Sequence, residues 1–581
     1  MNSGPSVAII GAGIGGICLA LDLQKQGLND YTIYEMETGI GGTWYQNRYP
    51  GCRCDVPAIL YSHSQFQNPN WSQTHPPRQE LLEYWQELAK AQGIDRHVKL
   101  RHRFVSAVWD EATKMYTVTV HDDEKDVDVV TTVNVLVSAI GAFAHPKTPK
   151  LKGQDLYHGL LVHAARWPFD LDPVTFRGKT VAVVGNGCAG AQIVSTLSED
   201  PEIKVVAIAR SPHWYIPNGQ DPTGRVRNSV PYSEGHKKLW NNYPIVQHVS
   251  RALTYLAMDS RWIIFPLKNK WLNDLNRKKV EKWQRESLPE EYKANGVPDF
   301  PLGAKRFVIE DGYLGALNKP NVKAVWGGLT GLTEAGVEIT DGRTFDADVV
   351  VFASGFDIEA NGLDIRGSES KVRDFSHASD IPQYHGMATP GIPNFFTLLG
   401  SFSAPGHSSV VFILESQAKY IMQLIKAMRD DHIPRLDIKR TAATKWIADT
   451  QRRADKTVWT KAKSYMRANG GNGRVWTHYP GHLSSLWWEN LYPIWSHWSG
   501  AEKLSVRQRA RKAVFILALL AAAGFGLTST ATGVALLHTL FPGFTVAHPT
   551  AWTPAALAGA TWENVTTGVV SLCTGITSLV M

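Results

Sequence analysis

The chain has 581 residues, which is long enough for two or three domains with complete hydrophobic cores. Hydrophobic residues make up 44% of it and charged residues 19%, and a net charge of +7 over this length is too dilute to indicate a nucleic-acid partner. The five cysteines are scattered and include no Cys-x-x-Cys pair, which argues against a metal site and against disulfide exchange.

The first glycine-rich turn follows the apolar strand expected at Val7–Ile10 and reads Gly11-Ala-Gly-Ile-Gly-Gly16. Glycine at Gly11, Gly13 and Gly16 permits a tight turn, close approach of a pyrophosphate and close packing of the helix that follows. Glu35 comes directly after the next expected strand, where an acidic side chain accepts hydrogen bonds from a ribose diol. This pattern predicts an FAD site.

A second glycine-rich turn follows the apolar strand at Val181–Val184, and Arg210 follows the strand after it. A guanidinium at this place pairs with a 2′-phosphate, so the second site is predicted to bind NADPH rather than NADH. The cofactor-binding candidates here are Gly185, Asn186, Gly187, Cys188, Ala189 and Gly190, with Gln192 in the following helix.

The remaining pattern predicts an α/β fold with two Rossmann-like dinucleotide-binding domains, the NADP domain inserted in the FAD domain, and a hydrophobic C-terminal helical tail. Alternating residues at 115–120 and 128–137 predict two strands before a linker near 147–152. The predicted division is residues 1–150 (FAD domain, first part), 151–375 (NADP domain, with a helical insertion at about 235–300), 376–500 (FAD domain, second part, with the substrate pocket) and 501–581 (basic flank and tail).

The tail is compositionally distinct, because Glu563 is its only charged residue after Lys512. The uncharged run Ala513–Leu540 is long enough to cross a hydrocarbon core of about 30 Å as a helix. A basic cluster precedes it (Arg507, Arg509, Arg511 and Lys512), so we expect a membrane anchor with the catalytic part in the cytoplasm, on the endoplasmic reticulum. A buried core helix and an apolar subdomain remain alternatives. Val565–Met581 is a candidate second span, and neither the number of spans nor the oligomeric state is predicted.

The segment Tyr157-His-Gly-Leu-Leu-Val-His163-Ala-Ala-Arg-Trp-Pro168 resembles the fingerprint of type I Baeyer–Villiger monooxygenases, Phe-x-Gly-x-x-x-His-x-x-x-Trp-Pro. Tyr157 stands where that family usually has Phe. Other blocks that resemble the family are Gly41–Tyr45 with Asn47–Asp55 (an FAD loop), Leu302–Arg306 with Gly312-Tyr313 (an active-site loop) and Ala353–Asp357. The resemblance covers about residues 5 to 500. It implies an FAD enzyme that uses NADPH and O₂ to convert a ketone into an ester or lactone.

By this resemblance Arg306 is the catalytic partner of an anionic flavin peroxide, and Asp55 holds Arg306 in place beside the flavin. The chemistry is reasonable, because a guanidinium stays protonated and offers a fork of donors to an anionic oxygen. The alternative is that Arg306 forms a structural ion pair with Glu310, one turn further on.

The resemblance also supplies cofactor contacts. On the FAD side they are Gly42, Thr43, Trp44, Arg53, Cys54, Asp55, Tyr61 and, through its backbone, Val105. Lys305 and Ser211 join Arg210 at the NADP phosphate. His163 is either a base or a hinge residue bonded to backbone. Ser464-Tyr465 departs from the family's frequent Ser-Trp pair, which leaves a contact with the nicotinamide ribose in question.

Six tryptophans are candidates for the substrate pocket, and the last four are equally candidates for a membrane-interface belt. They are Trp459, Trp476, Trp487, Trp488, Trp495 and Trp498.

The sequence therefore favours a Baeyer–Villiger monooxygenase for a lipophilic secondary metabolite such as a terpenoid, steroid or polyketide ketone. Two alternatives remain. One is a flavin monooxygenase that oxidises nitrogen or sulfur through a neutral C4a-hydroperoxide. The other is a membrane-tethered nucleotide-binding protein without activity, against which the retained Asp55 and Arg306 argue.

Overall fold

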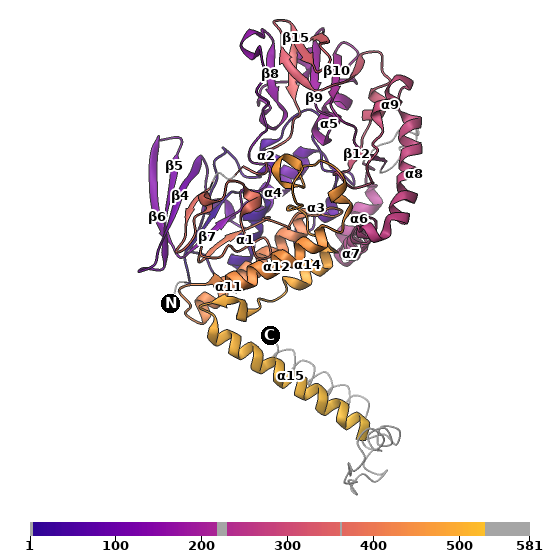
Figure 1. The fold of residues 1–581 in the computed structure, drawn as a ribbon. Helices are drawn as coiled ribbons and strands as arrows, with labels where there is room; N and C mark the ends of the chain where they lie inside the picture. The colour runs from indigo at the N-terminus through magenta and orange to yellow at the C-terminus, as the bar shows by residue number, and fades with distance from the viewer. Residues whose placement is uncertain (1–3, 218–228, 361–362, 529–581) are drawn as a thin grey trace. The chain divides into compact units, whose positions relative to one another are not determined.

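A computed structural model describes residues 4–217, 229–360 and 363–528 of the chain (Figure 1). Met1–Pro493 form one compact unit and Ile494–Met581 a second. The first unit contains two five-stranded parallel sheets, which is the arrangement predicted for two Rossmann-like domains.

The first parallel sheet forms the core of the FAD domain. Its order is β19-β7-β1-β2-β3, with bounds Phe395–Thr397, Val135–Ser138, Val7–Ile10, Tyr31–Tyr34 and Val98–Lys99. Strands β1 and β7 are buried along their whole length, as expected for a parallel sheet covered on both faces. Helices α1 (Ile14–Lys25) and α11 (Val410–Asp430) pack against each other in this domain.

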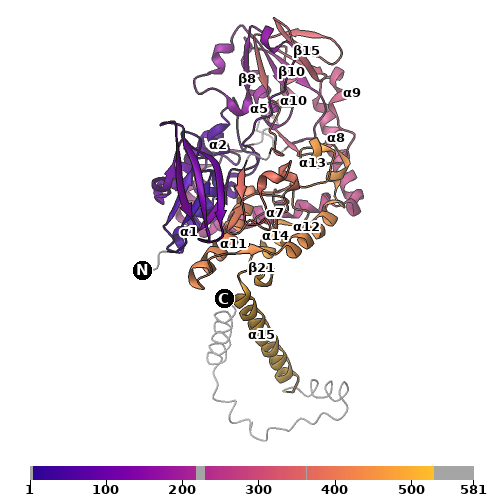
Figure 2. The same ribbon diagram turned by 60° about the vertical axis from the view of Figure 1, so that its left-hand side comes forward.

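A four-stranded sheet of order β18-β4-β5-β6 belongs to the same domain, and Figure 2 turns it toward the viewer. Its strands are β18 (Asp364–Arg366), β4 (His102–Asp110), β5 (Met115–Asp122) and β6 (Val127–Val133). The single strand predicted at 128–137 is wrong, because it divides between β6 and β7. Asn134 causes the break: its Oδ1 accepts hydrogen bonds from the amide (3.0 Å) and hydroxyl (3.1 Å) of Ser6.

The second parallel sheet forms the core of the NADP domain. Its order is β13-β10-β9-β17-β8, with bounds Val322–Trp326, Lys204–Ala209, Thr180–Val184, Val349–Phe352 and Leu160–His163. Smaller strands are β11 (Tyr215–Pro217), β12 (Val308–Glu310), β14 (Leu329–Leu332), β15 (Gly336–Ile339) and β16 (Thr344–Asp346). Helices α5 (Cys188–Leu197) and α10 (Tyr313–Ala316) contact each other.

The chain passes between the two domains twice, and the two passages are bonded to each other. The Lys147 amide donates to the Gly355 carbonyl (2.9 Å), and the Asp357 amide donates to the His145 carbonyl (2.8 Å). Strand β18 already pairs with β4 of the FAD domain, so the predicted domain boundary at residue 375 is too late. The chain returns to the FAD domain near residue 357, because the hydrogen bonds between the two passages hold the second passage beside the first.

Helices fill the stretch where the insertion was expected. They are α6 (Glu234–Asn242), α7 (Pro244–Ser260), α8 (Lys270–Ser287) and α9 (Lys293–Gly296), with the short 3₁₀ turn η5 (Arg261–Ile264) between α7 and α8. The remaining helices of the first unit are α2 (Thr43–Gln46), α3 (Ala58–Tyr61), α4 (Arg78–Ala91), α12 (Arg440–Ala454), α13 (Ala468–Gly471) and α14 (Leu483–Glu489).

The second unit contains helix α15 (Glu502–Thr528). Among the described residues, none of the helices meets the length and hydropathy needed to cross a membrane. The predicted span Ala513–Leu540 lies partly, and the candidate span Val565–Met581 wholly, outside the described residues.

Candidate active site

The first glycine turn has the shape that a pyrophosphate needs. Gly11 has φ of +106°, and a Cβ there would lie 2.7 Å from the Ala139 carbonyl oxygen. A Cβ on Gly42 would lie 2.9 Å from the Cα of Gly13, so two glycine backbones meet where α1 begins. Gly13 caps α1 without a side-chain hydrogen bond, which leaves the first-turn amides to an anion. The residues present therefore fit FAD.

Glu35 lies beside this turn. Its carboxylate accepts hydrogen bonds from the amides of Ala12 (2.7 Å) and Glu37 (2.9 Å), and burial raises the pKa of this carboxyl. The amide of His102 donates to the Glu35 carbonyl at 2.8 Å, which brings the start of β4 to the same place. Val105 lies three residues further along β4, where the strand register shifts.

The FAD loop continues through α2 and α3. Thr43 begins α2, and the rings of Trp44 and Tyr61 meet edge to face at 5.4 Å. Arg53 forms an ion pair of 2.9 Å with Asp311, which follows β12 of the NADP domain. Cys54 is buried beside Asp55, and burial raises the pKa of its thiol.

Gln192 of α5 bonds to this loop. Its amide donates to the Arg53 carbonyl (3.2 Å), and its oxygen accepts from the Tyr49 hydroxyl (2.9 Å). The residue therefore joins the NADP-domain helix to the FAD loop.

Arg306 and Asp55 form the ion pair that the resemblance implies. The Arg306 Nη2 lies 2.5 Å from the Asp55 Oδ2, and the side chains keep 39% and 21% of their surface exposed. The Asp55 carboxylate raises the pKa of the guanidinium further above its ordinary value. A charged pair that remains accessible is available to a ligand.

The alternative partner, Glu310, is excluded. It is buried, accepts a hydrogen bond from the Leu314 amide (3.0 Å) and has its pKa raised to about 7 by burial. The proposed structural pair between Arg306 and Glu310 is therefore wrong.

Sequence reasoning missed two neighbours of Arg306. Burial raises the pKa of the Tyr465 phenol while the nearby Arg306 charge lowers it, and the Tyr465 ring lies 6.2 Å from the ring of His478. Burial lowers the pKa of His478 to about 3, and the nearby Arg306 charge acts in the same direction, so this imidazole is neutral. The signal in the sequence for Tyr465 was the departure of Ser464-Tyr465 from the family's frequent Ser-Trp pair.

The second turn repeats the geometry of the first. Gly185 has φ of +117°, and a Cβ there would lie 2.5 Å from the Ala353 carbonyl oxygen. A Cβ on Gly190 would lie 1.8 Å from the Gly185 carbonyl oxygen. A Cβ on Gly187 would meet nothing within 4 Å, so the N-terminus of α5 opens onto space. Cys188 and Ala189 form the first positions of that helix.

Three groups suited to a 2′-phosphate gather at the end of β10. Lys305 Nζ lies 3.4 Å from the Ser211 hydroxyl, and the Asn186 side-chain amide donates to the Ser211 carbonyl at 3.0 Å. Burial, and after it the charge of Arg210, lowers the pKa of Lys305. Two cations that lie close enough to repel each other form a site for an anion, so these residues fit NADP.

His163 is bonded at both ring nitrogens. Nδ1 accepts from the Ala165 amide (3.1 Å), and Nε2 lies 3.3 Å from the Ser354 hydroxyl, which donates to the Lys147 carbonyl (2.6 Å). His163 thus connects the two chain passages between the domains, as the hinge interpretation expected.

The candidate tryptophans separate by burial. Trp459 and Trp476 are buried, and Trp459 packs with Trp262 and Phe265 in one apolar cluster. Trp487 and Trp488 are exposed and lie outside that cluster. Trp495 and Trp498 belong to the second unit. Among the described residues, no group of His, Cys, Asp and Glu side chains has a metal-binding arrangement.

Comparison with known proteins establishes the class first. Residues 9–75 match the NAD(P)-binding Rossmann-like domain family, and residues 60–221 match the L-lysine 6-monooxygenase/L-ornithine 5-monooxygenase family. The crystal structure of OTEMO with FAD and NADP superposes with a TM-score of 0.73 over 84% of this chain and 98% of that one, at 24% identity. Oxidised steroid monooxygenase bound to NADP gives 0.71 over 84% and 97%, at 26% identity. Fold and site together define a flavin- and NADP-dependent monooxygenase.

Sequence relatives then give the family. A Baeyer–Villiger monooxygenase of Pseudomonas aeruginosa is 28% identical over 492 residues, covering 83% of this chain and 89% of the relative. An uncharacterised monooxygenase of Mycobacterium tuberculosis is 31% identical over 499 residues, covering 84% and 95%. FAD-binding monooxygenase ktnD of Aspergillus niger is 30% identical over 440 residues, covering 73% and 69%. The chain belongs to the Baeyer–Villiger monooxygenase family, with FAD and NADPH as its cofactors.

Proposed function

We propose that this Baeyer–Villiger monooxygenase oxidises a lipophilic ketone, of the terpenoid, steroid or polyketide class, to an ester or lactone. The observation that carries the proposal is the accessible ion pair between Arg306 and Asp55, formed by loops of different domains.

Arg306 stabilises negative charge at the reacting oxygen atoms. The chemistry that bound FAD would supply at this site is the uptake of electrons from NADPH and the transfer of one oxygen atom of O₂ to the substrate. Asp55 occupies one edge of the guanidinium and fixes its direction, while the other N–H groups remain to bind an oxyanion. Because Asp55 raises the pKa of Arg306, the cation persists at every working pH.

Nucleotide binding is assigned to the two turns. The amides at the start of α1 and α5 bind the two pyrophosphates, and Glu35 binds the adenosine ribose of FAD. Arg210, Ser211 and Lys305 hold the 2′-phosphate of NADPH, because two cations and a hydroxyl match a dianion.

The membrane anchor is also a proposal. The uncharged run after Lys512 and the basic cluster before it support an anchor with the catalytic part in the cytoplasm, on the endoplasmic reticulum. A membrane also concentrates a lipophilic ketone near the enzyme.

The proposal is tested by replacing Arg306 with alanine. We expect ketone oxygenation to fall by about 10²–10³-fold, the effect of removing one strong oxyanion donor, while sulfide oxidation changes little. Product ester, sulfoxide and hydrogen peroxide are measured per NADPH consumed. The exposed Arg285→Ala serves as the matched control, and an unchanged flavin absorbance spectrum shows that FAD remains bound.

The match of residues 60–221 to amine N-monooxygenases makes heteroatom oxidation the second candidate. Equal loss of ketone and sulfide oxidation in FAD-loaded Arg306→Ala would refute the assigned role of Arg306. Sulfide or amine oxidation without any ketone turnover in the wild-type enzyme would favour the second candidate.

A further inference from the structure

Helix α7 of the insertion largely buries three polar side chains, together with Met258, and exposes several large apolar ones. Gln247 and Asp259 keep only 2% and 5% of their surface exposed, and the Arg251 side chain 12%. A helix on the surface of a soluble protein normally shows the opposite arrangement.

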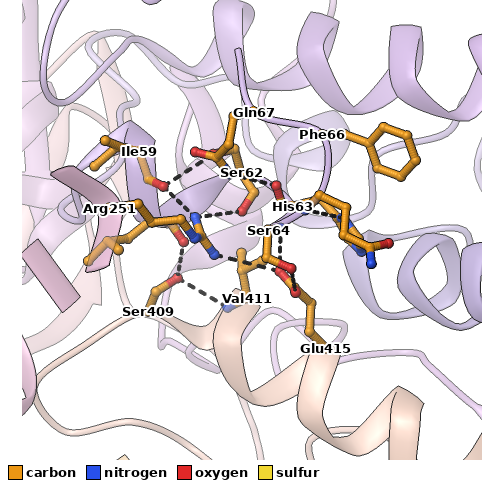
Figure 3. Close-up of polar contacts among 12 residues, drawn as sticks. Ile59, Ser62, His63, Ser64, Phe66, Gln67, Arg251, Ser409, Val411 and Glu415 are labelled. Carbon is orange, nitrogen blue, oxygen red and sulfur yellow. Dashed lines mark hydrogen bonds and ion pairs between the residues drawn. The ribbon is translucent and has the colours of Figure 1, made fainter. Parts of the chain in front are cut away.

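The inward polar residues bond to the FAD domain, and Figure 3 shows the contacts of Arg251. Arg251 donates to the carbonyls of Ile59 and Ser62 and lies 3.7 Å from Glu415, which accepts hydrogen bonds from the backbone and hydroxyl of Ser64. These contacts fix which face of α7 points outward, since turning the helix would move Arg251 into solvent and leave the Glu415 charge buried without this cation.

Asp259 and Gln247 hold the two ends of α7 in the same orientation, with the same face turned inward. Asp259 binds His407 (3.0 Å) and the Leu483 amide (2.7 Å), and Gln247 donates to the Asn68 carbonyl (2.7 Å).

The outward face forms an uncharged apolar stripe. Ile245, Val249, Leu253 and Leu256 follow one another at helical spacing and are 68%, 50%, 62% and 60% exposed. Neighbouring elements extend the stripe with Tyr243, Ile263, Trp271 and Leu275, which are 59%, 51%, 69% and 48% exposed. We call these eight side chains the apolar face of the insertion. Large apolar side chains exposed on α7, on η5 and on α8, which contacts η5, mark an interaction surface.

The surroundings of this face are basic. Between Glu234 and Glu281 the sequence has nine lysines and arginines against four acidic residues, and without the inward-facing Arg251 and Asp259 the numbers are eight against three. Exposed lysines lie in α6 (Lys238) and in α8 (Lys278 and Lys279), the elements that flank α7 in Figure 1.

We propose that the apolar face of the insertion docks on an anionic lipid surface. The stripe enters the boundary between headgroups and acyl chains, Tyr243 and Trp271 lie at headgroup level, and the flanking lysines bind lipid phosphates. A second copy of this chain fits less well, because a self-complementary contact would bring the lysines of both copies together. The docking surface is separate from the tail and independent of the proposed substrate.

The test uses the full-length FAD-loaded enzyme with one environment-sensitive fluorophore on a new cysteine, in a Cys573→Ser background. Leu253→Cys is the test site, and Val130→Cys on β6 is the matched control, because these side chains are 62% and 61% exposed. The vesicles contain phosphatidylcholine with or without phosphatidylserine. The same protein without an added cysteine gives the background labelling.

We expect the fluorophore at residue 253 to shift to the blue and to be quenched by nitroxide-labelled lipid on the phosphatidylserine vesicles. The fluorophore at residue 130 should do neither. In the double variant Lys278→Glu with Lys279→Glu, the gain in vesicle affinity that phosphatidylserine produces should fall roughly tenfold or more.

Two outcomes would overturn the proposal. The first is equal behaviour of both fluorophores on vesicles that do bind the enzyme, because membrane attachment would then not involve α7. The second is a blue shift at residue 253 without vesicles that grows with protein concentration, which would make a second copy the occupant. Neither outcome depends on ketone turnover, so failure here is distinguishable from failure of the proposed function.

Discussion

A guanidinium that binds an anionic oxygen needs a fixed direction, and Asp55 supplies it by pairing with one Nη atom of Arg306. The Tyr465 phenol lies near enough to this guanidinium for the Arg306 charge to lower its pKa against the larger effect of burial. Tyr465 remains 39% exposed, and a phenol beside Arg306 has a proton to donate to a bound oxygen atom. Tyr465 is therefore a residue of the site where this chain departs from the family pattern.

Replacing Tyr465 with phenylalanine removes only the hydroxyl. We expect about tenfold lower ketone turnover, as is usual when one donor to a charged oxygen atom is removed, and more hydrogen peroxide per NADPH. Tyr465→Trp, which restores the residue common in the family, is the companion variant. Unchanged coupling of NADPH use to ester formation in Tyr465→Phe would show that the hydroxyl has no part in the reaction.

At the scale of elements, the loop between β12 and α10 joins the site to the rest of the NADP domain. Glu310 at the end of β12 accepts the Leu314 amide, and Asp311 next to it pairs with Arg53 of the FAD loop. Burial raises the pKa of Glu310 from 4.5 to about 7. Ionised Glu310 is thus destabilising in the folded state.

This raised pKa predicts a pH dependence of stability. Because the folded state binds the proton more tightly than the unfolded state, the contribution of Glu310 to stability falls as pH rises from 4.5 to about 7, by up to about 3 kcal/mol. Glu310→Gln removes this loss. The melting temperature of the variant minus that of the wild type should therefore increase as the pH is raised from 5 to 8. The exposed Glu334→Gln is the control. A difference that does not change with pH would contradict the assignment.

At the scale of the whole molecule, two nucleotide domains are joined by the paired passages near residues 146 and 356 and by the contact of Gln192 with the FAD loop. His163 bonds to both passages through Ser354. NADPH bound on one domain must reach FAD on the other, and we propose that the choice of nicotinamide cofactor depends on Lys305, which the insertion returns to the end of β10.

Lys305→Ala tests that arrangement. We expect the KM for NADPH to rise about 10–100-fold, the range of one charge-assisted contact, with the KM for NADH nearly constant. Steady-state oxidation of each nucleotide measures this, and the exposed Lys268→Ala is the control. Equal weakening of both nucleotides would place Lys305 away from the 2′-phosphate.

Local sequence was sufficient for the two nucleotide turns, because glycine spacing, strand pattern and the charge of Glu35 or Arg210 all lie within about thirty residues. The ion pair of Arg306 with Asp55 came from the family resemblance, since the two residues are separated by 251 positions. The strand predicted at 128–137 was wrong, because the hydrogen bonds of Asn134 to distant Ser6 break it.

By itself, the sequence determined the class of fold and the two cofactors, since these depend on short motifs with fixed spacing, and the family resemblance supplied the chemistry of the site. Only the tertiary structure decided that Glu310 is buried away from Arg306, that Tyr465 lies beside Arg306, and that α7 exposes a row of apolar side chains. The periodicity of α7 shows two faces but not which one is covered. Arg251 and Asp259 decide it, because their partners Glu415 and His407 come from remote parts of the chain.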